Sequence, residues 1–131
     1  MDLHLGFFAN FNGSDSLLLE GSSLGIENLV SVLCAFMYSA EESLPIHTLA
    51  SVASRHPVQL FATRVLQRAV VSEPPRFAWQ LSSGELPNIQ EKLLELAHSP
   101  SGHQYFDIVG SSAQLIVSVG EYGESWWRAH G

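Results

Sequence analysis

The chain has 131 residues, a length typical of one domain and sufficient to bury a single hydrophobic core. Hydrophobic residues make up 46% of the sequence and charged residues 15%, which argues against intrinsic disorder. The net charge of −7, with 13 carboxylates against six Lys and Arg, argues against binding nucleic acid or an anionic membrane surface and is compatible with a basic protein partner.

The N-terminal segment and the cysteine content favour a cytoplasmic protein. The first residues, M-D-L-H-L-G-F-F, show neither a basic region nor a long apolar region of a signal peptide. The longest apolar run, residues 29–37, is too short to span a bilayer. The single cysteine, Cys34, excludes an intrachain disulfide and lies in an apolar setting that makes a thiol a poor nucleophile.

The first 40 residues predict a hairpin followed by a helix. Apolar residues occupy every second position over residues 3–11, which is the period of a half-buried strand. Turn formers at 12–15, including Asn12-Gly13, lead into an apolar run at 17–19 that should pair back as a second strand. Over residues 25–40 the apolar spacing changes to three and four, which predicts a helix.

The middle of the chain is less regular. Residues 45–56 fit either a helix or a strand, because both periods are present. Residues 58–65 and 76–81 are predicted strands, rich in aromatic and β-branched side chains. Residues 86–98 show a helical apolar face with a proline in the first turn, and Pro100 and Gly102 should end that helix.

A C-terminal hairpin is predicted from strands 103–109 and 114–119, joined by the loop 110–113. In this register Phe106 opposes Val117 and Ile108 opposes Leu115. Every large apolar residue except Val109 and Ile116 then shares one buried face with Val119. The opposite face should present polar and aromatic side chains with Val109 and Ile116 among them, namely His103, Tyr105, Asp107, Gln114 and Ser118.

Together these elements predict one α+β domain spanning residues 1–131. The expected architecture is a mainly antiparallel sheet of about five to seven strands with two helices packed on one face.

No motif establishes catalysis, a metal or a cofactor, and none of the three is expected. His103 and Asp107 are four residues apart on one strand, or about 13 Å, so they cannot contact each other directly. The histidines show no HxxxH or HExxH spacing, and the chain lacks the thiolates of a structural zinc site.

The adjacent Trp126 and Trp127 allow two interpretations. If the tail is extended, neighbouring side chains point to opposite sides, and one tryptophan is an exposed anchor for a partner. Alternatively, the tail folds back over the open edge of the hairpin and buries both.

Several segments of the last 60 residues resemble small bacterial immunity proteins of polymorphic and contact-dependent toxin systems. These segments are F-A-W-Q-L-S, L-L-E-L-A, G-H-Q-Y-F-D and V-S-V-G-E-Y. The resemblance implies an acidic, non-enzymatic, single-domain protein that binds and blocks a toxin.

The first functional hypothesis is therefore a non-enzymatic protein that binds a protein partner. Its contact surface is expected to combine carboxylates with aromatic side chains, namely Tyr105, Asp107, Glu121, Tyr122, Glu124 and Trp126. The alternative is a small-ligand-binding domain or small enzyme with a pocket between sheet and helices, involving His103 and Arg76. A homodimer formed through the Trp126–Trp127 tail is a third possibility.

Overall fold

The computed structural model describes residues 2–11, 13–64, 74–108, 110 and 112–130. Its elements follow the chain in the order β1 (Leu3–Phe11), β2 (Ser14–Gly21), α1 (Ser23–Tyr38), β3 (Ser43–Pro45), a 3-10 turn (Ile46–Thr48), β4 (Val52–Ser54), β5 (Gln59–Arg64), β6 (Arg76–Leu81), α2 (Leu86–Ala97), β7 (Gly102–Asp107), β8 (Gln114–Val119) and α3 (Glu124–His130). The predicted α+β class is confirmed.

The described strands form two sheets, and both are mixed. The larger has the order β4-β1-β2-β8-β7 and the smaller has the order β3-β5-β6. The hairpins β1–β2 and β7–β8 are antiparallel, as predicted, but β2 pairs with β8 in parallel, as do β1 with β4 and β5 with β6. The expectation of one mainly antiparallel sheet was wrong because local patterns predict hairpins and not the pairing between distant strands.

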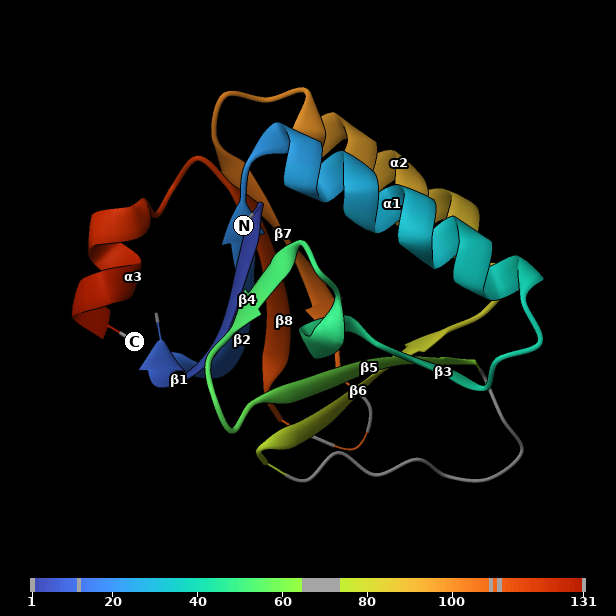
Figure 1. Ribbon diagram of the computed structural model, residues 1–131, viewed down its shortest axis with the longest axis horizontal. Helices are drawn as coiled ribbons and strands as arrows, with labels where there is room; N and C mark the ends of the chain where they lie inside the picture. Colours follow the sequence, from blue (N-terminus) through green and yellow to red (C-terminus); the bar gives the residue numbers. More distant parts are fainter. Residues whose placement is uncertain (1, 12, 65–73, 109, 111, 131) are drawn as a thin grey trace.

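Helices cover both faces of the five-stranded sheet (Figure 1). The helices α1 and α2 lie side by side, and their apolar faces pack with Leu17, Leu19, Leu115 and Val117 in the main core. The alternate residues Leu18 and Ile116 point to the other face, where they pack with Trp127 of α3. The two predicted helices on one face are thus present, and α3 on the opposite face was not predicted.

Both ends of α1 are capped. Ser22 accepts a hydrogen bond from the Gly25 amide at 3.1 Å, which is a typical N-cap interaction. At the other end, the Arg64 guanidinium from β5 donates to the carbonyl oxygens of Phe36 at 2.7 Å and Met37 at 3.1 Å. A cation bonded to the last carbonyls of a helix satisfies groups that lack partners within the helix. Arg64 therefore ties the small sheet to α1.

The predicted C-terminal hairpin is present, but its register differs by two residues. Phe106 pairs with Leu115 and Asp107 with Gln114, so the connection is longer than the expected four residues. A shift of two residues leaves every side chain on its expected face. Phe106, Leu115 and Val117 are accordingly buried in the main core. The alternation of apolar residues determined which face of the hairpin each side chain occupies. The length of the connection, which that alternation does not encode, determined which residues pair.

Residues 45–56, which the sequence left undecided, form neither a full helix nor one continuous strand. Pro45 ends β3, residues 46–48 make a 3-10 turn, and β4 follows as a three-residue edge strand beside β1. Predictions that involve residues 12, 65, 109 and 111 lie outside the described residues. None of the helices in the described part of the chain is long and apolar enough to cross a membrane.

Candidate functional site

The outer face of the β7–β8 hairpin is exposed on one strand only. Because β7 is the edge of its sheet, His103, Tyr105 and Asp107 remain exposed, and Tyr105 retains 50% of its accessible surface. On β8 the same face lies under the C-terminal segment, so Ser118 is fully buried. The predicted exposure of Ser118 was therefore wrong, because the sequence pattern did not reveal that a third helix covers β8.

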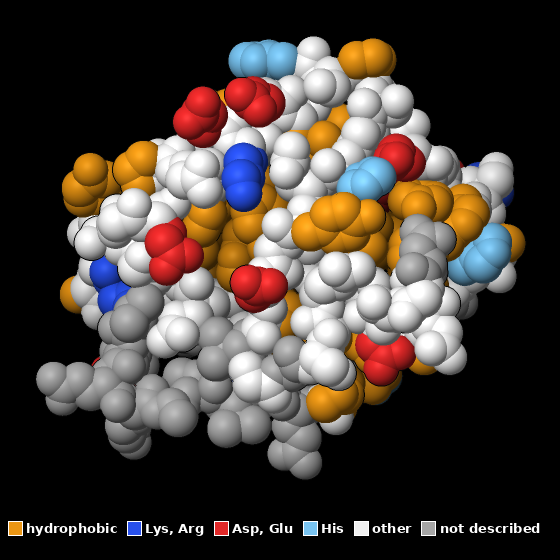
Figure 2. Space-filling view, turned by 180° about the vertical axis from the view of Figure 1, so that it is seen from behind, with side chains coloured by type: hydrophobic (Ala, Val, Ile, Leu, Met, Phe, Trp, Pro, Cys, Tyr) orange, Lys and Arg blue, Asp and Glu red, His pale blue; other side chains and the backbone are white. Residues whose placement is uncertain are grey.

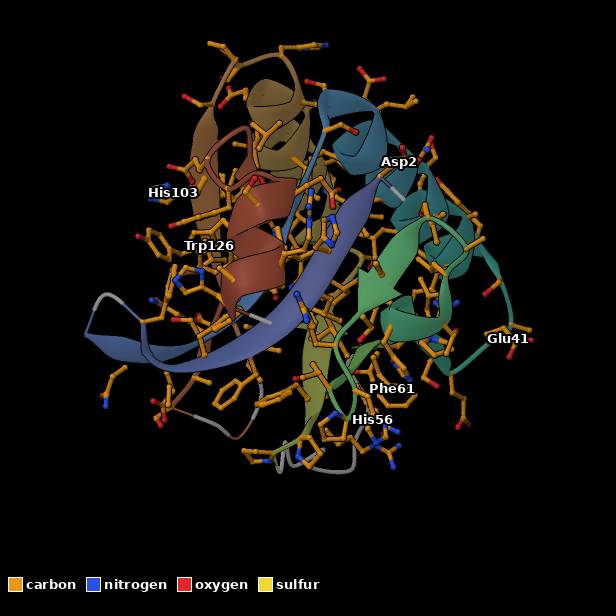
Figure 3. All side chains as sticks on the ribbon, turned by 60° about the vertical axis from the view of Figure 1, so that its left-hand side comes forward. Asp2, Glu41, His56, Phe61, His103 and Trp126 are labelled. Atoms are coloured by element: carbon orange, nitrogen blue, oxygen red, sulfur yellow. The ribbon has the colours of Figure 1, made fainter. Side chains whose placement is uncertain are left out.

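His103 is held by a carboxylate from beyond the end of β8. Its Nδ1 lies 3.0 Å from Oε1 of Glu121, and the buried Ser118 hydroxyl donates to the same oxygen at 2.7 Å. The His103 ring also contacts the edge of Tyr105, with 5.0 Å between ring centroids. His103 projects outward from β7 (Figure 3). The structure thus brings His103, a residue of the ligand hypothesis, into contact with Glu121 and Tyr105, two residues of the partner-binding hypothesis.

A cleft of about 370 Å³ lies beside Tyr105, between β6, α2 and β7. Its floor is apolar and its rim is polar. The lining residues are Trp79, Gln80, Glu85, Asn88, Ile89, Lys92, Tyr105, Phe106, Asp107, Ile108 and Gln114. Figure 2 shows this side of the molecule, where apolar side chains lie at the bottom of a hollow and charged side chains of both signs surround it.

Two opposite charges in the cleft have no partner in the described part of the chain. Among the described residues, neither the Lys92 ammonium nor the Asp107 carboxylate makes a hydrogen bond or an ion pair. Asp107 and Tyr105 were predicted as binding residues from the sequence, whereas Lys92 and Asn88 were not. Their spacing of four on a predicted helix was the available signal, because residues four apart lie on the same helix face. Only the tertiary structure places this face against β7.

Arg76, the second residue of the ligand hypothesis, lies elsewhere. It is exposed at the start of β6, and its guanidinium lies over the Phe61 ring at 4.6 Å from the centroid. Neither Arg76 nor His103 lines the cleft. The structure therefore places these two residues with different neighbours, Phe61 for Arg76 and Glu121 for His103.

The two tryptophans lie on α3 rather than on an extended tail. Trp127 is 1% exposed and packs with Leu18 and Ile116, whereas Trp126 is half-buried. Trp126 contacts Phe8, Phe11 and Tyr122. Neighbours on a helix are about 100° apart, so one can enter a core while the other lies at its rim. The helix covers a face of the sheet and not the open edge at β7.

Glu20 is a buried carboxylate beneath α3. It is 3% exposed, and its Oε1 accepts a hydrogen bond from Nε1 of Trp127 at 2.9 Å. Its Oε2 accepts from the backbone N–H of Tyr122 at 3.2 Å. Burial raises the pKa of Glu20 above its usual value, and these two hydrogen bonds lower it only in part. This role was not predicted, because in the sequence Glu20 is simply a polar residue at the end of a strand.

A second imidazole–carboxylate pair fixes the outer side of α3. Nε2 of His4 lies 2.9 Å from Oε1 of Glu124, and the His4 ring stacks on Trp127 at 5.1 Å between centroids. The hydrogen bond and the charge of His4 lower the pKa of Glu124. Glu124 and Tyr122, predicted as partner-binding residues, therefore both belong to the attachment of α3, and both lie near the surface.

The hydroxyl of Ser118 and the possible metal ligands can be assessed from these contacts. Ser118 donates to Glu121 rather than to an imidazole, and it is buried, so it is not placed as a nucleophile. Among the described residues, no three His, Cys, Asp or Glu side chains form a group that could hold a metal ion. Exposed tyrosines such as Tyr105 are a residue type enriched at binding hot spots.

No protein-family model, curated protein or solved structure matches the chain.

Proposed function

We propose that this protein is a non-enzymatic binding protein that recognises a protein partner through the exposed side of β7 and the adjoining cleft. One observation carries the proposal. Tyr105, half-exposed on an edge strand, lies beside a cleft whose Lys92 and Asp107 have no partner among the described residues. Tyrosine supplies a large contact area, and unbonded charges set the orientation of a partner.

The edge position of β7 adds a second mode of contact. Its outer backbone groups have no strand partner in the described part of the chain. Such an edge can pair with an extended segment of another protein, and alternate side chains then enter neighbouring pockets. Here the neighbouring pocket is the cleft, with Trp79 and Phe106 at its floor.

The partner is proposed to be basic and, specifically, a toxin of a polymorphic or contact-dependent system. The net charge of −7 and the exposed carboxylates Asp107 and Glu121 support a basic partner, because they attract it before contact. The resemblance of the C-terminal segments to immunity proteins supports the class of toxin. Glu121 also holds His103, so it contributes to the shape of this surface.

The test is a titration by isothermal calorimetry of this protein with the product of the gene that lies directly upstream of its own gene. Tyr105→Ala and Asp107→Lys are each expected to weaken binding at least about tenfold, since an anchor aromatic and a desolvated charge dominate interface energies. Tyr38→Ala is the matched control, because Tyr38 is 88% exposed at the end of α1 and does not line the cleft. Equal affinities for all three variants would contradict the proposed surface.

A second candidate function is the binding of a small polar ligand in the cleft itself. The volume of about 370 Å³ falls within the range of small-molecule sites, and the opposite charges of Lys92 and Asp107 suit a zwitterion. In a thermal-shift screen of the amino acids, at least one should raise the unfolding temperature, and Lys92→Met should abolish that shift. Arg128→Met, which removes an exposed cation on α3, should leave the shift unchanged. No shift with any amino acid would count against this function.

A further inference from the structure

A second cavity, of about 580 Å³, lies away from the proposed binding surface. It is enclosed by β1, by the loop between β4 and β5, by the two prolines before β6 and by the last residue of α3. The lining residues are Gly6, Phe7, Phe8, Arg55, His56, Pro57, Val58, Pro74, Pro75 and His130. His56 projects from its loop at one end of the molecule (Figure 3). None of these residues lines the cleft beside Tyr105.

The aromatic walls of this cavity are fixed by packing. Phe7 stacks on Phe77 of β6 with 5.2 Å between ring centroids. Phe8 contacts both tryptophans of α3, at 5.3 Å and 5.8 Å. Walls held in this way exist before a ligand arrives, so binding does not have to order them. Together with the prolines and Val58 they offer an apolar surface to a ligand.

Among the described residues that line the cavity, Arg55 carries the one permanent charge. Two histidines, His56 and His130, also line it, and no described Asp or Glu does, although the chain has 13 carboxylates against six Lys and Arg. Two other cavities differ in this respect: the cleft contains Asp107 and Glu85, and a third cavity of about 310 Å³ contains Asp2, Glu20 and Glu124. Among its described lining residues, the cavity of 580 Å³ therefore has a guanidinium and no carboxylate.

Arg55 is held in place and still has donors to offer. Its backbone N–H donates to the Leu5 carbonyl at 2.9 Å, and its Nη2 donates to the carbonyl of Trp127. A guanidinium has five N–H groups, so these contacts orient the side chain without using all its donors. In the described part of the chain no carboxylate forms an ion pair with it.

From this combination we infer that the cavity binds a small organic anion, namely a carboxylate on an aromatic or aliphatic body. The carboxylate would accept hydrogen bonds from Arg55, with His56 beside it, while the body lies against Phe7, Phe8 and the prolines. Charge-assisted hydrogen bonds to a guanidinium are among the strongest in proteins, and the apolar walls favour burial of the body. This site is independent of the surface proposed for the protein partner.

The test compares two probes of one shape, 2-naphthoate and the uncharged 2-naphthamide, by isothermal calorimetry with the unmodified protein. The naphthoate is expected to bind at least about tenfold more tightly, since only it makes the charge-assisted bonds. His56→Glu should weaken naphthoate binding by about tenfold, because the new carboxylate competes for Arg55. His98→Glu is the matched control, an exposed histidine after α2 that does not line the cavity.

Amide chemical shifts locate the probe. Naphthoate should shift the signals of Gly6 and Val58, and Tyr105→Ala should leave its affinity unchanged. Equal affinity for the two probes, absence of saturable binding, or shifts confined to the cleft would each overturn the inference. None of these results bears on partner binding at β7, so the two proposals fail separately.

Discussion

Replacing Trp127 by Ala is expected to lower the free energy of unfolding by about 3–5 kcal/mol, the range for a large aromatic side chain removed from a core. Trp127 is 1% exposed and packs with Leu18 and Ile116 beneath α3. The substitution also removes the N–H donor to buried Glu20. Urea denaturation followed by circular dichroism gives the free energy directly.

The neighbouring tryptophan provides the control. Trp126 is half-buried at the rim of the same cluster, so Trp126→Ala should lower the free energy of unfolding by only about 1–2 kcal/mol. An equal decrease in the free energy of unfolding for the two substitutions would contradict the burial of Trp127 alone. The comparison therefore tests whether the tail buries only Trp127 or both tryptophans.

Replacing Glu20 by Ala should lower the free energy of unfolding by about 2 kcal/mol at neutral pH, because two buried donors lose their acceptor. These donors are Nε1 of Trp127 and the backbone N–H of Tyr122. Glu20→Gln should lower it less, since a carboxamide oxygen still accepts one hydrogen bond. A loss with Gln as large as with Ala would contradict the assigned hydrogen bonds.

The stability difference between the wild-type protein and Glu20→Gln is expected to depend on pH. Burial raises the pKa of folded Glu20 above its usual value of 4.5, so the folded state binds a proton more readily than the unfolded state. The wild-type protein should therefore gain stability relative to Glu20→Gln as the pH falls from neutral through the folded pKa, and the gain should end below the unfolded pKa. Chemical denaturation at a series of pH values measures this difference. A difference between wild type and variant that is constant over that range would show that Glu20 titrates normally.

The local elements could be predicted from the sequence because their periods are strong. Alternation at residues 3–11 and the helical spacing at 25–40 each favour one secondary structure, and both predictions are confirmed. In the C-terminal hairpin, alternation correctly assigned Phe106 and Val117 to the core. The register was not predictable, because a shift of two residues preserves both faces.

The candidate sites depended on contacts that no local pattern contains. Tyr105 and Asp107 were identified from strand alternation, but the cleft beside them requires Lys92, which a different element supplies. His103 and Glu121 are 18 residues apart and meet only because β8 returns alongside β7. The cavity of about 580 Å³ likewise combines residues from β1, the loop after β4 and the end of α3.

By itself, the sequence determined the α+β class, most of the helices and strands, and which face of each strand enters the core, since these follow from side-chain period. The tertiary structure alone decided that β2 pairs with β8 in parallel, that α3 covers the second face and that Ser118 and Glu20 are buried beneath it. The physical reason is that pairing between distant segments depends on the total area they bury together. No single segment of the chain encodes that quantity.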